Sequence, residues 1–369
     1  MDNEYYQFNE DNNQEPEVKN IENDERPNKK EALIGIILGI GYITILTVVP
    51  LYLIYLLFGR PYTDAESMLM SSGAQMITAF VVIVAMGFIS RRVIKEIRLG
   101  FTFKALLRGL GYALLLYVAA IAVNLIMTIL FGSTTTNANQ TSINELMANY
   151  PIVGVLFTCV LAPVIEELIF RYYLFGALSK KNVALAFIVT ALGFGLIHML
   201  ASFSSYASDG NLSSLLNDLK TLPDYVVAGL IFCWVYYKHK KIGYPIFAHM
   251  IYNTIATIIM LISIQNTPVL IQNVKTTDNT IYFDLRVQNS TLTKIELYEY
   301  KADADDELFA VMELPDSIYT DLSFTGLPNQ SVYTIKITYE YETITIDESM
   351  RPISETHTSS ITTHAKTRG

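Results

Sequence analysis

The chain has 369 residues, of which 51% are hydrophobic and only 17% are charged, and its mean hydropathy is +0.32. Soluble domains carry about 25% charged residues, so this composition excludes an ordinary soluble protein and indicates a membrane protein. The net charge of −9 is concentrated at the two ends of the chain, and this acidic balance argues against nucleic-acid binding.

Residues 1–31 are rich in Asn, Asp, Glu and Gln and nearly lack aliphatic side chains, which predicts a disordered acidic tail. Seven apolar stretches follow, each near the roughly 20 residues that a helix needs to cross a bilayer. They are residues 32–58, 68–90, 106–131, 151–178, 183–203, 223–237 and 242–264. The expected fold class is a polytopic α-helical membrane protein with about seven transmembrane helices.

Lysine and arginine residues gather before the first apolar stretch and after the second, fourth and sixth, whereas the other loops are nearly free of them. Because basic loops stay in the cytoplasm, this pattern predicts a multi-pass protein of the cell membrane with its amino terminus in the cytoplasm and its carboxyl terminus outside. The basic run 91–108 is expected to rest on anionic lipid. Tyr172, Tyr173 and the aromatic cluster 234–237 are expected to anchor at the membrane interface.

The last hundred residues, 267–369, change to the period of a strand. Runs such as 280–287 and 332–341 alternate apolar with polar residues, with turn residues between them at intervals of about ten. About seven such strands predict an antiparallel β-sandwich outside the cell. Residues 326–333 resemble the approach to the sixth strand of a fibronectin type III domain, where a Leu-Pro turn leads into a tyrosine, here Tyr333, that bonds back to the loop.

The fourth apolar stretch contains three charged residues, Glu166, Glu167 and Arg171. A charge at mid-bilayer costs about 2.5–3.5 kcal/mol on insertion scales, so these groups need partners. Glu167 and Arg171 are four apart and share a helix face, which predicts an ion pair. Glu166 lies about 100° round the helix and is left to face another helix. Pro163 is expected to loosen the backbone hydrogen bonds beside the pair.

Two histidines fall inside apolar stretches, His198 in the fifth and His249 in the seventh. Each alone is typical of a hydrogen bond between helices. At 1.5 Å per residue, Glu166 and His198 both lie roughly 20 Å from the inner face. Asn253 follows His249 by four residues and shares its helix face. We therefore expect one carboxylate, two imidazoles and an amide to meet inside the membrane.

These four side chains are sufficient to hydrolyse an amide bond with water. Glu166 and His198 would hold and deprotonate the water. His249 and Asn253 would donate hydrogen bonds to the developing oxyanion. The ion pair of Glu167 and its arginine is expected to fix the position of Glu166.

Three motifs lie on three separate apolar stretches, in one order along the chain. They are Glu166-Glu-x-x-x-Arg171, Phe194-x-x-x-His198 and His249-x-x-x-Asn253. Together they resemble the CPBP family, which contains CAAX prenyl endoproteases and bacteriocin-processing or self-immunity proteins and is classed as intramembrane glutamic endopeptidases. The resemblance covers residues 32–264 and implies a hydrolase that cuts a membrane-associated peptide, of CAAX or bacteriocin type. It implies the same four catalytic residues and places Phe194 beside them, whereas the β-sandwich is an addition to the family pattern.

Three alternatives remain open at this stage. Glu166, His198 and His249 could instead bind zinc in a metalloprotease, although the sequence has no His-Glu-x-x-His and the metal-free reading, without a cofactor, is favoured. The protein could be a non-catalytic immunity or scaffold protein that docks a protein or cell-surface partner through its sandwich. It could also be a transporter with a buried proton relay, against which no inverted repeat is detectable. In each case membrane lipid is a partner, and for the protease a peptide or protein substrate is another.

Overall fold

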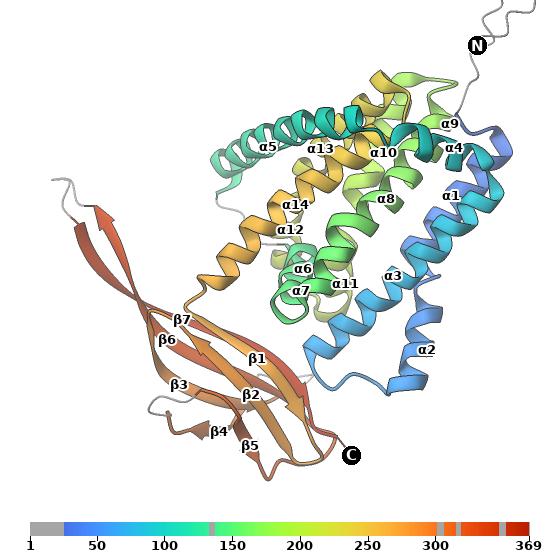
Figure 1. The fold of residues 1–369 in the computed structure, drawn as a ribbon. Coiled ribbons are helices and arrows are strands. Elements are labelled where there is room, and N and C mark those ends of the chain that lie inside the picture. The colour runs from blue at the N-terminus through green and yellow to red at the C-terminus, as the bar shows by residue number, and fades with distance from the viewer. Residues whose placement is uncertain (1–25, 133–136, 301–305, 315–318, 347–351, 369) are drawn as a thin grey trace, which may run out of the picture.

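The computed structural model describes residues 26–368 apart from 133–136, 301–305, 315–318 and 347–351. Helices occupy the first two thirds of the chain and strands the last third, and the two parts lie side by side (Figure 1). The predicted tail, 1–31, lies mainly outside the described residues. Asn28 caps the first helix through a reciprocal pair of hydrogen bonds with Glu31, and the helix begins at Lys29, so the last three residues of that range are helical.

The helical part consists of α1 (Lys29–Thr44), α2 (Val48–Phe58), α3 (Asp64–Ile89), α4 (Arg91–Gly100), α5 (Phe103–Phe131), α6 (Ala138–Asn149), α7 (Pro151–Leu156), the π-helix η1 (Phe157–Leu161), α8 (Ala162–Glu167), the π-helix η2 (Leu168–Phe175), α9 (Gly176–Leu178), α10 (Val183–Ile197), α11 (Leu200–Asp209), α12 (Leu212–Leu219), α13 (Leu222–His239) and α14 (Gly243–Gln265).

Among the described residues, five helical stretches are long and apolar enough to cross a membrane. They are Glu66–Ile89, Phe103–Phe131, Pro151–Leu178, Leu212–His239 and Gly243–Ser263. Two bent pairs bring the number to as many as seven: α1 with α2, bent by 41°, and α10 with α11, bent by 46°. Each of these stretches overlaps one predicted apolar stretch, which confirms the predicted class of membrane protein.

Three helices, α4, α6 and α12, lie where the sequence predicts only loops, and of these α4 and α6 are not part of any crossing. α4 buries Val93 and Glu96, and the Glu96 carboxylate accepts a hydrogen bond from the Ile242 backbone N–H at 3.2 Å. α6 is capped by Asn137, whose side-chain amide also donates to the Thr221 hydroxyl at 2.7 Å. Both helices are too short and too polar to cross a membrane, so a search for apolar stretches misses them.

The core of the helical part forms around the fourth crossing. Tyr172 and Tyr173 are fully buried there, so the prediction that they anchor at the interface is wrong. The reason is the close approach of α1: a Cβ at Gly35 would overlap the ring of Tyr173, and one at Gly39 would lie 2.7 Å from Ile169. The two glycines let α1 cover aromatic residues that hydropathy alone places at the membrane edge.

The C-terminal part consists of β1 (Val269–Thr276), β2 (Thr280–Val287), β3 (Ser290–Glu299), β4 (Glu307–Met312), β5 (Leu322–Thr325), β6 (Val332–Ile346) and β7 (Pro352–Lys366). These strands form two antiparallel sheets, in the orders β1-β2-β5 and β4-β3-β6-β7, around a shared apolar core. The predicted two-sheet β domain is therefore confirmed. Tyr333 is fully buried at the start of β6, and the bond to the loop that the fibronectin resemblance implies stays a prediction.

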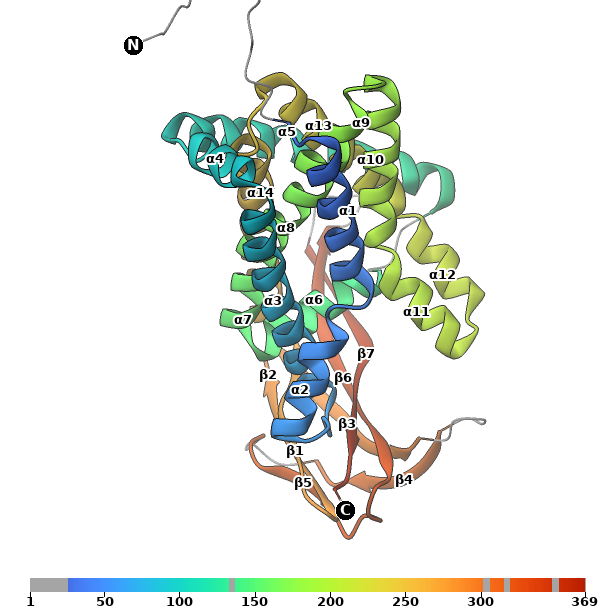
Figure 2. The same ribbon diagram turned by 90° about the vertical axis from the view of Figure 1, so that its right-hand side faces the viewer.

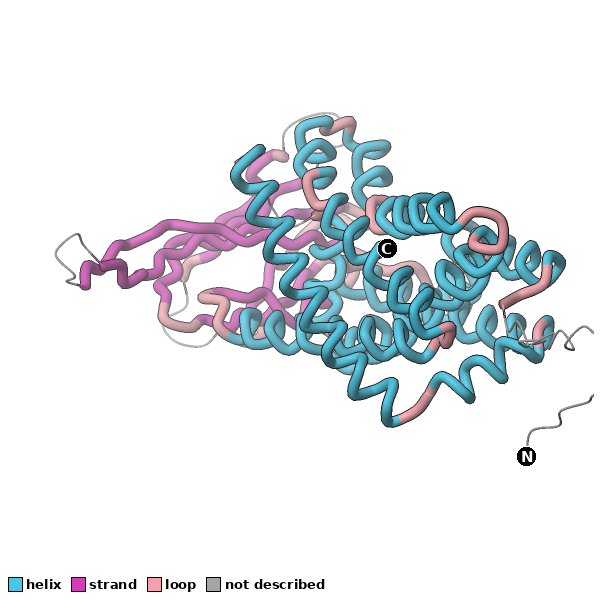
Figure 3. The backbone as a smooth tube through the Cα atoms, turned by 90° about the horizontal axis from the view of Figure 1, so that it is seen from above, coloured by secondary structure: helices cyan, strands magenta, loops and turns pink. Residues whose placement is uncertain are grey.

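The end of β7 also pairs with the loop before α3. Thr63 and Ala365 form an antiparallel bridge, and the Lys366 backbone N–H donates to the Tyr62 carbonyl at 2.7 Å. The Arg368 guanidinium lies 4.8 Å from the centre of the Tyr62 ring. The sandwich is thus joined to the helices at two points, by the chain after α14 and by β7 (Figure 2). Seen from above, its strands extend well beyond the helices (Figure 3).

Candidate active site

The fourth crossing changes its helical geometry on both sides of the glutamate pair. α8 lies between η1 and η2, two segments in which backbone hydrogen bonds run from residue i to i−5. The Ala162 N–H donates to the Phe157 carbonyl, but the equivalent bond from Pro163 cannot form because proline has no N–H. Pro163 therefore leaves the Thr158 carbonyl without its π-helical partner.

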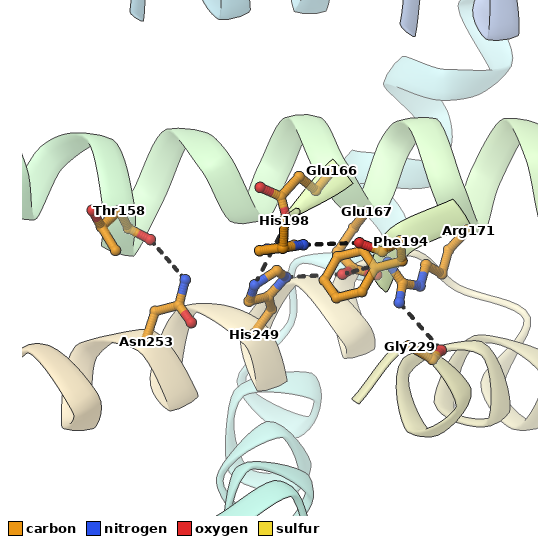
Figure 4. Close-up of polar contacts among 9 residues, drawn as sticks. All are labelled: Thr158, Glu166, Glu167, Arg171, Phe194, His198, Gly229, His249 and Asn253. Carbon is orange, nitrogen blue, oxygen red and sulfur yellow. Dashed lines mark hydrogen bonds and ion pairs between the residues drawn. The ribbon is translucent and has the colours of Figure 1, made fainter. Parts of the chain in front are cut away.

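Asn253 of α14 bonds to that carbonyl. Its Nδ2 donates to the Thr158 oxygen at 2.9 Å, which ties α14 to the irregular part of the fourth crossing (Figure 4). A side-chain amide has two N–H groups, so the second remains able to donate. The proline and the asparagine, 90 residues apart in the sequence, thus meet at one backbone defect.

Glu167 and Arg171 form the predicted ion pair. The Arg171 Nη1 lies 3.2 Å from the Glu167 Oε1, and neither side chain is exposed. The guanidinium also lies 4.3 Å from the centre of the Phe194 ring and 5.0 Å from that of Phe232, and it donates to the Gly229 carbonyl at 3.2 Å. The buried cation is held by one carboxylate, aromatic faces and a backbone carbonyl.

The second partner of Glu167 is His249. The His249 Nδ1 lies 2.9 Å from the Glu167 Oε1, and because a carboxylate accepts, Nδ1 carries the proton. Glu167 therefore orients His249, and its expected role in fixing Glu166 stays a prediction. The two glutamates are adjacent in one helix and point in directions about 100° apart, so they contact different groups.

Glu166 faces the other nitrogen of the same imidazole. Its Oε2 lies 3.9 Å from the His249 Nε2, and its side chain is 16% exposed (Figure 4). That oxygen is buried and makes no hydrogen bond to any residue that the structure describes. His249 therefore has a carboxylate on each side, one bonded directly and one at a longer distance.

His198 is held from α10. Its Nδ1 lies 2.8 Å from the Phe194 carbonyl, which can only accept, so Nδ1 carries the proton and Nε2 is left as an acceptor. The Phe194 ring is 4.7 Å from the His198 ring and 5.9 Å from the His249 ring. Phe194 thus lies against both imidazoles and the Arg171 cation, as its place in the motif implies.

Two aromatic residues of α13 contact the site without any sequence signal. The Phe232 ring stacks on His249 at 4.6 Å, and the Tyr225 ring stacks on His198 at 4.3 Å. Aromatic residues are common in the apolar helices of membrane proteins. Nothing in the sequence of the sixth predicted crossing therefore marks these two as site residues. The backbone carbonyl of Thr158 was missed for a different reason, since only the hydrogen-bond pattern of a folded helix reveals it.

The zinc alternative requires three protein ligands that converge on one point. In the part of the chain that the structure describes, no group of three or more His, Cys, Asp or Glu side chains is arranged to hold a metal ion. Glu166, His198 and His249 as placed here do not fit a zinc site with three protein ligands, and no step below uses a metal.

Comparison with known proteins matches residues 148–255 to the family model "Type II CAAX prenyl endopeptidase Rce1-like". Among curated proteins, the chain is 30% identical over 137 residues (37% of this chain, 48% of the relative) to the Bacillus subtilis "Putative membrane peptidase YdiL". It is 29% identical over 157 residues (42% and 57%) to the Staphylococcus aureus "Membrane-embedded CAAX protease MroQ". The chain spans about half the length of these relatives. No solved structure matches it.

Residues 148–255, which carry most of the candidate site, thus match the model of the Rce1-like CAAX prenyl endopeptidase family, and the similarity to the two membrane peptidases points the same way. The protein as a whole is a multi-pass membrane protein in which this segment is followed by a two-sheet β domain.

Proposed function

We propose that this protein is an intramembrane endopeptidase that hydrolyses a peptide bond of a membrane-associated substrate with a water molecule activated by Glu166. The observation that carries the proposal is the pairing of Glu166 Oε2 with His249 Nε2 at 3.9 Å, where the carboxylate oxygen is buried and has no other partner among the described residues. That separation is too long for a direct hydrogen bond and suits one water molecule bonded to both atoms.

Glu166 takes the proton of the attacking water in this mechanism, and His198 helps to hold that water. His198 presents an unprotonated Nε2 because its Nδ1–H is engaged by the Phe194 carbonyl. As the water oxygen attacks the carbonyl carbon, its proton passes to the carboxylate, which later protonates the leaving amine. A glutamate in this role requires no metal and no covalent intermediate.

His249 and Asn253 stabilise the oxyanion that forms on the substrate carbonyl. His249 keeps its Nδ1–H bonded to Glu167, and a proton on Nε2 would let the same ring donate a hydrogen bond to the oxyanion. Asn253 donates its second N–H, because the first is engaged by Thr158. Donors held in place by the protein require no reorganisation during the reaction, which is the main source of their effect.

The substrate class follows from the setting of the site. A CAAX-type or bacteriocin-like peptide that is itself held at the membrane can reach residues of the fourth, fifth and seventh crossings without first leaving the bilayer. The charge pattern of the loops supports a cytoplasmic amino terminus and an extracytoplasmic sandwich. We assign the sandwich, as a fibronectin type III-like module, to a protein or cell-surface partner.

The test is a trap experiment in cells that express the full chain. Glu166→Gln keeps the shape of the side chain but cannot accept the proton, so uncleaved substrate should accumulate and co-purify with the variant. Glu145→Gln, at an exposed position of α6, is the matched control and should behave as the unaltered protein. Peptides enriched on Glu166→Gln then serve as substrates for the purified protein, with and without a strong chelator.

Each result decides between the competing functions. Cleavage that is lost in Glu166→Gln and persists in chelator supports the metal-free protease. Loss of activity in chelator, restored by zinc, would replace this mechanism with a metalloprotease. Full biological activity of Glu166→Gln, with loss of activity on deletion of 267–369, would instead establish a non-catalytic docking protein.

A further inference from the structure

Two adjoining cavities lie between α5 and α13, two helices that contact each other. The first, of about 470 Å³, is lined by Arg108, Gly111, Tyr112, Leu115, Lys238 and His239. The second, of about 370 Å³, is lined by Leu115, Phe187, Leu230, Ile231 and Trp234. Leu115 lines both, so a polar cavity continues into an apolar one.

The polar cavity carries positive charge that the protein does not neutralise. Arg108 comes from α5 and Lys238 from α13, and no acidic side chain lines the cavity. Lys104, one helical turn before Arg108, adds a third positive charge that acts on His239. Neither Arg108 nor Lys238 pairs with a carboxylate in the described part of the chain. A cavity with this charge favours an anionic ligand.

Aromatic contacts fix the shape of the polar cavity. The Tyr112 hydroxyl lies 2.7 Å from the His239 Nε2, and the His239 ring stacks on Tyr244 at 3.9 Å. The Lys238 ammonium lies 4.7 Å from the centre of the Trp234 ring. A Cβ at Gly111 would meet no atom within 4 Å, so this glycine leaves open space on the α5 side. The cations therefore line an open hollow whose walls are held by these contacts.

The apolar cavity runs along α13 from the same end. Leu230, Trp234 and Lys238 are spaced four residues apart and so follow one face of the helix over about 12 Å. No polar surface lines this cavity. A ligand that fills both cavities must carry an anionic group at one end and a hydrocarbon chain at the other.

We propose that the two cavities together bind one anionic phospholipid, with its phosphate between Arg108 and Lys238 and the start of an acyl chain along Leu230, Ile231 and Trp234. A soluble phosphate compound would use only the charged cavity, whereas a membrane lipid uses both and lies where α5 and α13 face the bilayer. Basic cavities between transmembrane helices are known binding sites for acidic head groups. The head-group end of the lipid site, at His239, is about 15 Å along α13 from Gly229, which contacts Arg171 of the candidate active site, whereas the acyl-chain end at Leu230 is next to Gly229 in the helix.

The single tryptophan of the chain, Trp234, lies in the wall of the proposed site and reports on it directly. The purified full-length protein in detergent is titrated with phosphatidylglycerol or phosphatidylcholine whose acyl chains carry bromine, which quenches tryptophan fluorescence on contact. Phosphatidylglycerol should quench Trp234 at a concentration at least tenfold lower than phosphatidylcholine. Arg108→Ala and Lys238→Ala should each reduce that preference by about fivefold, as expected for one basic residue beside an anionic lipid.

Two further variants separate the site from general surface charge. Lys181→Ala removes an exposed lysine elsewhere on the predicted cytoplasmic side and should leave the preference unchanged. Gly111→Phe keeps every charge but fills the open space, and should weaken quenching by phosphatidylglycerol.

Three outcomes would overturn the proposal. They are equal quenching by the two lipids, an equal effect of Arg108→Ala and Lys181→Ala, and full quenching in Gly111→Phe. Displacement of the brominated lipid by millimolar glycerol 3-phosphate would show a site for free phosphate compounds instead of a lipid.

Discussion

Glu167 accepts a hydrogen bond from the Nδ1 of His249 at 2.9 Å, although 82 residues separate the two in the sequence. The same carboxylate oxygen pairs with Arg171 at 3.2 Å. One buried glutamate therefore joins the cation of its own helix to an imidazole of another. This contact defines His249 as a residue with one fixed nitrogen and one nitrogen directed at Glu166.

The first prediction separates the structural role of Glu167 from its positioning role. Glu167→Gln leaves the buried Arg171 without a counter-charge and should lower the free energy of unfolding by about 3–5 kcal/mol. Glu167→Gln combined with Arg171→Met removes both charges and should recover most of that stability. Both variants should have a kcat reduced on the order of 10²-fold or more relative to the unaltered protein, because His249 is no longer oriented.

Thermal unfolding in detergent and cleavage of a trapped substrate measure the two effects independently. Full activity in the double variant would show that Glu167 serves only to neutralise Arg171.

The second prediction concerns the oxyanion donor. Asn253→Ala should reduce kcat by about 10²–10³-fold with little change in KM, as for other oxyanion donors. It should also lower stability by about 1–3 kcal/mol, because the Thr158 carbonyl loses its partner. Asn124→Ala is the matched control, since Asn124 is exposed on α5 and donates only to the carbonyl one turn before it. Comparable losses of activity in both variants would contradict the assigned role.

The third prediction compares two glycines in the helical part. A Cβ at Gly243 would overlap the backbone of Gly100, which cannot rotate away, whereas a Cβ at Gly111 meets nothing within 4 Å. Gly243→Ala should therefore lower the free energy of unfolding by about 1–3 kcal/mol. Gly111→Ala should leave it unchanged or raise it by up to about 1 kcal/mol, because alanine favours a helix. The order of the two melting temperatures in detergent tests the contact between α4 and α14.

The fourth prediction tests how the sandwich meets the helices. Thr63 and Ala365 form an antiparallel bridge, in which Cα atoms lie about 4.5–5.5 Å apart, so Thr63→Cys with Ala365→Cys should form a disulfide under mild oxidation. Thr63→Cys with Ile353→Cys is the control, since Ile353 lies about 40 Å further along β7, and it should not cross-link. The native cysteines, Cys159 and Cys233, are buried. Cross-linking of neither pair would show that the sandwich is not held against α3.

The fifth prediction tests the orientation in the membrane. A membrane-impermeant maleimide on intact cells should label Thr291→Cys in the sandwich but not Lys181→Cys in the loop after α9. Both positions are exposed in the folded chain, so only the membrane should separate them. The reverse labelling pattern would invert the topology that the basic loops predict.

Local patterns were sufficient for much of the fold. Hydropathy located every stretch that could cross the membrane, because a bilayer demands about 20 apolar residues in a row. The alternation after residue 267 located the strands, because successive side chains in a strand point to opposite faces. Helical spacing paired Glu167 with Arg171, since residues four apart share a face.

Other features could not be read in this way. The burial of Tyr172 and Tyr173 depends on α1, which is distant in sequence and approaches closely at Gly35. The helices α4 and α6 have neither the length nor the hydropathy of a crossing, and their burial depends on capping and hydrogen bonds to other loops.

For the candidate site, the sequence by itself determined which residue types were available, namely two carboxylates, a cation, two imidazoles and an amide on three apolar helices. The tertiary structure decided which of them meet: Glu167 with His249, Glu166 across from the second nitrogen of that ring, and Asn253 with the carbonyl that Pro163 leaves free. The physical reason is that spacing along one helix fixes only which side chains share a face. Contacts between helices depend on their rotation and separation, which are set by glycines and by π-helical turns.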